Sequence, residues 1–469
     1  MNTRYVTLIA CSAAMGGLLF GYDWVVIGGA KPFYERYFGL TTPAAIAWAM
    51  SSAVMGCLFG AVASGALSDR FGRKRLLAAS AALFIVTSLG TALASTFTEF
   101  LVWRILGGVA IGLASNLSPM YIAEVAPAGM RGRLVSMNQF TIVIGILAAQ
   151  AVNWLVADSV PPDATPDFIL SSWNGQTGWR WMFGLTAVPG LAFFASMFAI
   201  PESPRWLCAQ GRHEDARKIL SRIGGSAFAD AELSEIRATV SSARGTVKDL
   251  TSPAVRPVLM LGIFIAVLQQ WSGINVVFNY AQEVFAGAGY QVSDILLNIV
   301  ITGVINMVCT VVALVTVDRI GRRPLMLAGT AGLALIYLFL GLSYRIGVTG
   351  FPVLLLVALA VACFACTLGP VTWVVLSEMF PNRIRGAAMG VGVFALWAGC
   401  FVLTFTYPYL NRELGAAGTF WLYSAVCATG FAVLRLKLPE TKGLSLERIE
   451  RDLSGRPPQV ASAATTARS

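Results

Sequence analysis

The chain has 469 residues, of which 56% are hydrophobic and only 12% are charged, about half the charged share of an ordinary soluble protein. With a mean hydropathy of +0.70, this composition excludes a disordered chain and disfavours a soluble globular enzyme. The formal net charge of +10 fits either a nucleic-acid-binding protein or a membrane protein, and the positions of the basic residues decide between them.

Twelve long apolar stretches follow one another along the chain. Each is long enough to cross a membrane as a helix of about 20 residues. A backbone in lipid must satisfy its own hydrogen bonds, which favours helices in such stretches. They lie at about 5–30, 46–67, 76–95, 98–122, 134–157, 179–200, 257–288, 293–316, 324–345, 351–379, 386–408 and 416–438. We therefore expect an all-α membrane protein with twelve transmembrane helices.

The basic residues are distributed unequally between the connections of these stretches. Twenty-eight of the 34 lie at the N-terminus, in the even-to-odd connections or after Leu434; five lie on the other side, and Arg104 lies inside a span. Because cytoplasmic loops carry the excess of Lys and Arg, both termini are predicted to be cytoplasmic, in the plasma membrane or bacterial inner membrane. The basic excess is thus a topology signal, and no nucleic acid is expected as a partner.

The polar segment 201–256 interrupts the apolar stretches after the sixth. Its charged and apolar residues alternate in the manner of short amphipathic helices that lie under the membrane. We therefore expect an N-terminal six-helix bundle at 1–200, a cytoplasmic helical linker at 201–256, a C-terminal six-helix bundle at 257–438 and a cytoplasmic tail at 439–469.

Three short signatures occur once in each half of the chain, in the same order and on the same predicted membrane side. The pairs are Asp69-Arg-Phe-Gly-Arg-Lys74 with Asp318-Arg-Ile-Gly-Arg-Arg323, Glu124-x-x-Pro-x-x-x-Arg131 with Glu378-x-x-Pro-x-x-x-Arg385, and Pro201-Glu-Ser-Pro-Arg205 with Pro439-Glu-Thr-Lys-Gly443. Such ordered repetition indicates a six-helix unit used twice.

The charges in these signatures have two interpretations. The basic residues alone could serve only to anchor the topology. Acidic residues contribute little to topology, so their presence favours ion pairs across helix ends that form a cytoplasmic gate network and break when the interface opens. The predicted members are Asp69, Arg70, Arg73, Glu124, Arg131, Glu202, Arg205, Asp318, Arg319, Arg322, Glu378, Arg385 and Glu440.

Two opposite charges lie inside spans, Asp23 in the first and Arg104 in the fourth. Ionisable groups at membrane depth are costly and need a partner or a function. The two residues form either a structural ion pair or a protonatable carboxylate controlled by an arginine; the two roles are compatible, and we favour proton coupling.

Amides and aromatic residues gather inside the later spans. Amides both donate and accept hydrogen bonds, which suits a ligand with hydroxyl groups, and aromatic faces suit apolar C–H surfaces. The candidates are Gln139, Gln269, Gln270, Asn275, Asn279, Asn306, Trp373 and Trp397. A lone buried amide could merely bridge helices, but four within eleven residues favour a ligand site.

Two predicted hinges accompany these residues. Gln270 and Asn275 can face one cavity only if the helix bends, for which Ser272-Gly273 is suitable. Pro370, after Gly369, removes a helical hydrogen bond and predicts a kink just before Trp373.

Taken together, these motifs resemble the sugar porter family of the major facilitator superfamily, and among its members the bacterial xylose-type sugar:proton symporters. The resemblance rests on Gly21-Tyr-Asp23, the two Asp-Arg-x-Gly-Arg loops, Pro201-Glu-Ser-Pro-Arg205, Gln269-Gln-x-Ser-Gly-Ile-Asn275 and Pro439-Glu-Thr-Lys-Gly443.

The resemblance implies a secondary active transporter that imports a pentose or hexose with a proton by alternating access between two six-helix bundles. It also implies the coupling role of Asp23 and Arg104 and the sugar contacts of the eight amides and aromatics, in a protein that functions as a monomer. Ile146 stands where the xylose type has a glutamine, Leu396 replaces an amide and Asn279 replaces a tyrosine, so the sugar stays open.

Three alternatives accompany this expectation: an uncoupled facilitative sugar carrier, which Ile146 favours; a non-transporting sugar sensor; and a membrane enzyme. The segment after Gly443 is short for a signalling tail, and no Ser/His/Asp constellation lies near the spans. Cys363-x-x-Cys366 lacks a second cysteine pair and no nucleotide fingerprint is present. We expect no enzyme activity, no metal and no cofactor.

Overall fold

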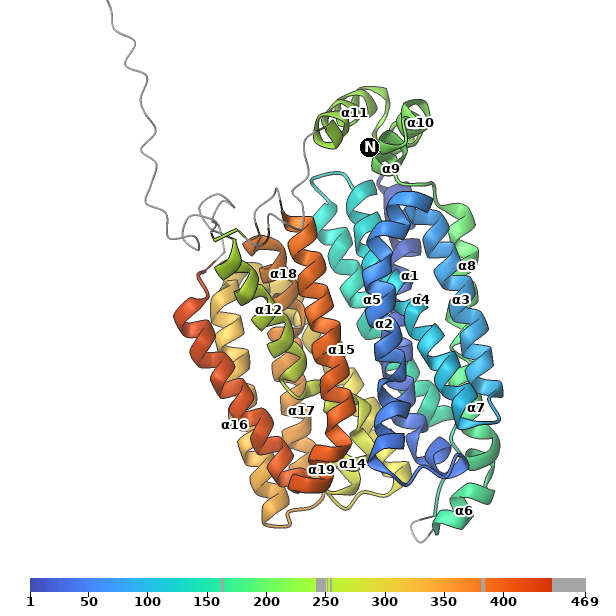
Figure 1. Cartoon of the computed structure of the whole chain (residues 1–469), viewed down its shortest axis with the longest axis vertical. Coiled ribbons are helices and arrows are strands. Elements are labelled where there is room, and N and C mark those ends of the chain that lie inside the picture. The colour runs from blue at the N-terminus through green and yellow to red at the C-terminus, as the bar shows by residue number, and fades with distance from the viewer. Residues whose placement is uncertain (162–163, 242–249, 251, 254, 381–383, 441–469) are drawn as a thin grey trace, which may run out of the picture.

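The computed structural model describes residues 1–161, 164–241, 250, 252–253, 255–380 and 384–440, and the regular structure in these residues is helical (Figure 1). The helices are α1 (Thr3–Tyr37), α2 (Pro43–Phe71), α3 (Arg73–Leu93), α4 (Phe97–Val125), α5 (Arg131–Val156), α6 (Pro166–Ser171), the π-helix η1 (Asn174–Gly178), α7 (Trp179–Gly184), α8 (Ala187–Ala199), α9 (Pro204–Ala209), α10 (His213–Gly224), α11 (Ser226–Ser241), α12 (Arg256–Trp271), α13 (Ile274–Asn279), α14 (Ala281–Ala286), α15 (Val292–Ile320), α16 (Arg322–Arg345), α17 (Phe351–Cys366), α18 (Leu368–Met379) and α19 (Arg385–Lys437).

Within the described part of the chain, 11 helical stretches are long and apolar enough to cross a membrane, whereas the sequence predicts twelve. The difference lies in α19, which has 53 residues and is far longer than the roughly 20 that a membrane requires. Its backbone leaves the helical conformation at Gly415, where φ is 66°. The eleventh and twelfth predicted spans lie on either side of this glycine, so the described helices account for all twelve stretches.

Two spans are broken inside the membrane region. The seventh consists of α12, α13 and α14, and the tenth consists of α17 and α18. In the tenth span α17 ends at Cys366, which is the residue whose carbonyl Pro370 would have to bond in a continuous helix. The break therefore lies at Thr367, three residues before the proline that causes it.

Glycines allow the helices of the N-terminal half to pack closely. A Cβ atom on Gly56 of α2 would lie 2.0 Å from the carbonyl oxygen of Ile105, and one on Gly108 of α4 would lie 2.0 Å from that of Ala53. Small residues at such contacts bring helix backbones together in membranes. This close contact of α2 with α4 includes Ile105, the residue next to Arg104.

The N-terminus and α9–α11 lie at one end of the molecule, and α6 lies at the other (Figure 1). The backbone N–H of Asn2 donates a hydrogen bond to the carbonyl oxygen of Ile223 in α10, at 2.7 Å. Trp206, Leu220 and Leu233 of α9–α11 belong to a small apolar core of their own. We name the two ends the α9–α11 end and the α6 end.

Candidate functional site

Asp23 of α1 and Arg104 of α4 form an ion pair inside the helix bundle. Nη1 of Arg104 donates a hydrogen bond to Oδ1 of Asp23 at 2.6 Å, and the two side chains are 4% and 8% exposed. The guanidinium also lies 5.3 Å from the ring centre of Phe183 in α7. Nε of Arg104 has no hydrogen-bond partner among the described residues. The structure thus brings the two predicted intramembrane charges into direct contact.

A small cavity borders this ion pair. Its volume is about 10 Å³, about the space that one water molecule needs. It is lined by residues of α1, α2, α4 and α13, namely Phe20, Asp23, Trp24, Ile27, Met50, Ala53, Val54, Cys57, Arg104, Ile111 and Asn279. Asn279 is 3% exposed, and its Oδ1 atom has no hydrogen-bond partner in the described structure. One predicted sugar-binding amide therefore borders the same cavity as the predicted proton-coupling pair.

Three further amides lie together where α12 and α13 meet. Nδ2 of Asn275 donates to Oε1 of Gln270 at 2.5 Å, and Nε2 of Gln270 donates to Oε1 of Gln269 at 2.5 Å. The helix ends at Trp271 and restarts at Ile274, with φ at 85° on Gly273, a conformation that suits glycine. The predicted bend is thereby confirmed, and it brings Gln270 and Asn275 together.

Trp397 of α19 joins the aromatic residues of α1. Its ring centre lies 5.6 Å from that of Phe20 and 5.9 Å from that of Trp24, both in edge-on geometry. Phe20 and Trp24 line the Asp23 cavity, so Trp397 of the C-terminal half packs against two of the cavity's wall residues.

The remaining predicted sugar contacts are less closely connected. Asn306 of α15 is 5% exposed, Gln139 of α5 is half-buried, and Trp373 of α18 is partly buried against the main core. Among the described hydrogen bonds, none joins their side chains to the amides of α12 and α13.

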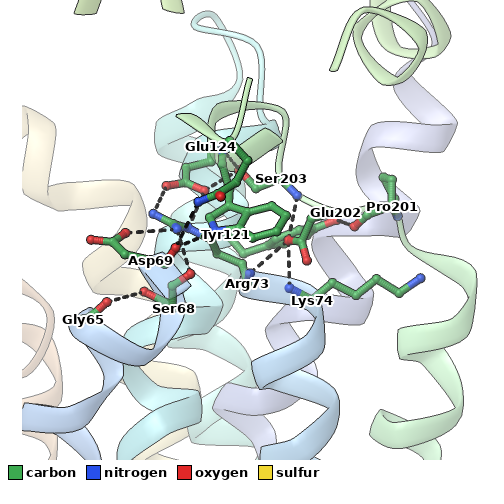
Figure 2. Close-up of polar contacts among 12 residues, drawn as sticks. Gly65, Ser68, Asp69, Arg73, Lys74, Tyr121, Glu124, Pro201, Glu202 and Ser203 are labelled. Atoms are coloured by element: carbon green, nitrogen blue, oxygen red, sulfur yellow. Dashed lines mark hydrogen bonds and ion pairs between the residues drawn. The ribbon is translucent and has the colours of Figure 1, made fainter. Parts of the chain in front are cut away.

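The first copy of the charged signatures forms a polar cluster at the α9–α11 end (Figure 2). Nε and Nη2 of Arg73 bind the two carboxylate oxygens of Glu124, each at 3.1 Å, and Nη1 binds Asp69 at 3.1 Å. Oε1 of Glu202 accepts from the backbone N–H groups of Arg73 and Lys74 at 2.9 and 3.0 Å. Glu202 thus caps the start of α3, where backbone N–H groups lack helical partners.

The second copy repeats this geometry in the C-terminal half. Nη2 and Nε of Arg322 bind Glu378 at 2.9 and 3.2 Å, and Glu440 accepts from the backbone N–H groups of Arg322 and Arg323 at 3.0 and 3.1 Å. Gly72 and Gly321 have φ values of 92° and 103°, which residues with a Cβ rarely adopt. The sequence repeat is therefore also a structural repeat.

The ion pairs described in the two clusters join helices of the same half rather than helices of opposite halves. Arg70 lies against the ring of Phe71, Arg319 is exposed, and Arg131 and Arg205 are partly exposed. The side chains of Asp318 and Arg385 lie outside the described residues. A role of these clusters in gating stays a prediction.

Several contacts between the two halves lie toward the α6 end. The backbone N–H of Val160 donates to Oγ of Ser293 at 2.9 Å, and Trp48 of α2 lies 5.4 Å from Phe405 of α19 between ring centres. Lys31 of α1 pairs with Glu283 of α14. At the α9–α11 end, an open surface hollow of about 610 Å³ lies along α1 and is lined by residues of that helix: Thr3, Arg4, Thr7, Leu8, Cys11, Ser12 and Met15.

Sequence reasoning missed Lys31, Glu35 and Glu283. It counted Lys31 only as one of the few basic residues on the far side of the membrane. The signal that could have found it is a lysine followed four residues later by a glutamate at the end of an apolar span.

Comparisons with known proteins identify the family of this chain. The chain matches the profile of the family described as "Sugar (and other) transporter" over residues 9–453. A D-xylose-proton symporter of Escherichia coli is 38% identical, with 96% of each chain covered, and an arabinose-proton symporter of Bacillus subtilis is 36% identical, with 95% covered. The solved structure of the E. coli xylose transporter in a partially occluded inward-open conformation gives a TM-score of 0.82 at 34% identity, covering 94% of this chain and 100% of that one. The chain therefore belongs to the sugar transporter family and is a multi-pass integral membrane transporter, not an enzyme.

Proposed function

We propose that this protein imports a monosaccharide together with a proton. The observation that carries the proposal is the cavity shared by the Asp23–Arg104 ion pair and Asn279, because it places a protonatable group beside an amide of the sugar site. The names of the two relatives, a D-xylose-proton and an arabinose-proton symporter, support a pentose or a related sugar as the substrate.

Proton binding acts through the charge of Asp23. The ionised carboxylate holds Arg104 in place at 2.6 Å. A proton on Asp23 removes the negative charge, so the attraction to the guanidinium falls to that of a neutral hydrogen bond. Arg104 is then free to turn toward other acceptors, which changes the relative free energies of the transporter's conformations.

Sugar binding uses groups that are already aligned. The chain of Gln269, Gln270 and Asn275 leaves donors and acceptors that sugar hydroxyl groups can engage, and Trp397 supplies an apolar face. Asn306, Gln139 and Trp373 complete the site when the halves close around the ligand.

Alternating access arises from two six-helix bundles, 1–200 and 257–438, that rock about the site, with 201–256 as a cytoplasmic linker and 439–469 as a cytoplasmic tail. We assign the α9–α11 end to the cytoplasmic side of a bacterial inner membrane, because this end carries the excess of basic residues. The contacts at the α6 end and the match to an inward-open structure support an inward-facing state. The transporter functions as a monomer.

The two charged clusters form the cytoplasmic gate network in this proposal. The sequence predicts ion pairs that break when the interface opens, but the described pairs lie within one half each, so in this proposal they hold the helix ends of each bundle together while the bundle moves. Gly273 and the Gly369-Pro370 step supply the hinges, since α12 and α17 both end just before them.

Sugar-induced alkalinisation of a weakly buffered cell suspension tests the coupling. We expect the external pH to rise when the transported sugar is added, and uptake competition among xylose, arabinose and glucose to identify that sugar. The second candidate is an uncoupled facilitator, which the apolar Ile146 favours; sugar uptake without any pH change would establish it.

A further inference from the structure

Lys31, Glu35 and Glu283 form a charged cluster at the α6 end, which we name the Lys31 cluster. The ammonium of Lys31 lies 2.9 Å from Oε1 of Glu35, one turn further along α1, and also pairs with Oε1 of Glu283 in α14. The side chain of Lys31 is 2% exposed, and those of Glu35 and Glu283 are 15% and 25% exposed. One lysine is therefore shared between a carboxylate of its own helix and a carboxylate of the opposite half.

The cluster has one more acidic than basic group. The groups around it do not balance the surplus: Tyr34, Tyr280 and Tyr407 are neutral phenols, and Lys31 lies 5.7 Å from the centre of the Tyr280 ring. Arg36 attracts Glu35, but it is exposed to solvent, which weakens this attraction, and Arg104 is paired with Asp23. An uncompensated charge is costly in a buried site, and a proton on one of two neighbouring carboxylates removes that cost.

Glu283 uses only one of its two carboxylate oxygens in this cluster. Its Oε1 atom faces Lys31, whereas its buried Oε2 atom has no hydrogen-bond partner among the described residues. A protonated carboxyl group at this site lets the cluster hold one positive and one negative charge.

The two ion pairs respond differently to opening of the α6 end. Glu35 stays one helical turn from Lys31 in every conformation, because both lie on α1. Glu283 belongs to the opposite half and separates from Lys31 when that side opens. The open state then holds a neutral Lys31–Glu35 pair and a hydrated, ionised Glu283.

We propose that the Lys31 cluster is a proton-binding latch of the extracellular gate, an inference that rests on the proposed alternating access. Closure brings Glu283 onto Lys31 and takes one proton from the extracellular water onto a carboxylate of the cluster; opening returns that proton to the same side. The latch therefore transfers no proton across the membrane, and it makes closure of the gate easier at low extracellular pH.

Distances between spin labels on the two halves test the latch. Cysteines replace Thr41 and Arg345, two exposed residues at the α6 end, in a chain whose native cysteines are replaced. The measurements use the Asp23→Asn background, which removes the pH response of the coupling carboxylate. Between pH 5.5 and 8.5 we expect the ratio of closed to open molecules to fall, by up to about tenfold per pH unit for one linked proton.

The matched variant is Glu35→Gln, which leaves one lysine and one glutamate in the cluster. We expect it to abolish most of the pH response while keeping the gate able to close, and Lys31→Met to reduce the closed population at every pH. Two results would overturn the proposal. One is a pH response that is unchanged in Glu35→Gln. The other is a ratio of closed to open molecules that does not depend on pH when the Lys31 cluster is native. Adding sugar at constant pH separates the latch hypothesis from the proposed alternating access. If sugar changes the distances between the labels but pH does not, the latch is wrong and alternating access stands.

Discussion

Replacement of Asp23 by Asn separates sugar binding from proton coupling. In the native protein Arg104 donates a hydrogen bond to Asp23 at 2.6 Å. The amide of the variant keeps an oxygen that can accept this bond, but it cannot take up a proton in the working pH range. A gradient of one pH unit supplies about 1.4 kcal/mol per proton. With one proton per sugar, the native protein should therefore accumulate sugar about tenfold at most in proteoliposomes under that gradient.

For Asp23→Asn we expect an accumulation ratio near one, with sugar exchange across the same vesicles largely retained. The assay compares labelled-sugar accumulation under an imposed pH gradient with counterflow in its absence. Glu214→Gln in the exposed part of α10 is the matched carboxylate control and should leave both unchanged. Undiminished accumulation by Asp23→Asn would refute the assignment of Asp23 as the coupling residue.

The same position also predicts a stability difference. Asp23→Leu leaves the guanidinium of Arg104, whose side chain is 4% exposed, without an acceptor in its place. Breaking a buried ion pair in this way costs about 3–5 kcal/mol, so the thermal midpoint in detergent should fall more for Leu than for Asn. Equal midpoints for the two variants would show that the ion pair contributes little to stability.

Three further predictions concern other parts of the site. Asn275→Ala removes one hydrogen-bond donor of the amide chain. One lost hydrogen bond of about 1–1.5 kcal/mol should raise the KM for sugar about five- to tenfold. An unchanged KM in an uptake assay would exclude Asn275 from the sugar site. Trp397→Ala should lower transport at least about tenfold, since it removes the ring packed on Phe20 and Trp24, whereas Trp397→Phe should retain part of the activity. Gly72→Ala should lower the thermal midpoint, because φ is 92° and the new Cβ would lie 2.4 Å from Glu202; Gly129→Ala, which meets no atom within 4 Å, is the control and should not.

The sequence by itself determined the membrane architecture. The lengths of the apolar stretches led to the helices, because a backbone in lipid has no other way to satisfy its hydrogen bonds. The bend at Ser272-Gly273 was also predictable, since Gln270 and Asn275 cannot share one face of a straight helix. The Asp23–Arg104 contact followed from the cost of leaving either charge alone in the membrane.

Only the tertiary structure decided how segments distant in the chain meet. The charged signatures predicted ion pairs, but their partners depend on the packing of helix ends, which places Glu124 and Glu202 on Arg73 and its backbone. Lys31 appeared in the sequence as one more basic residue, and its meaning comes from Glu283, 252 positions away. Local patterns report what each helix must bury, whereas the contacts between helices depend on the register and crossing of whole bundles, which no short stretch of sequence contains.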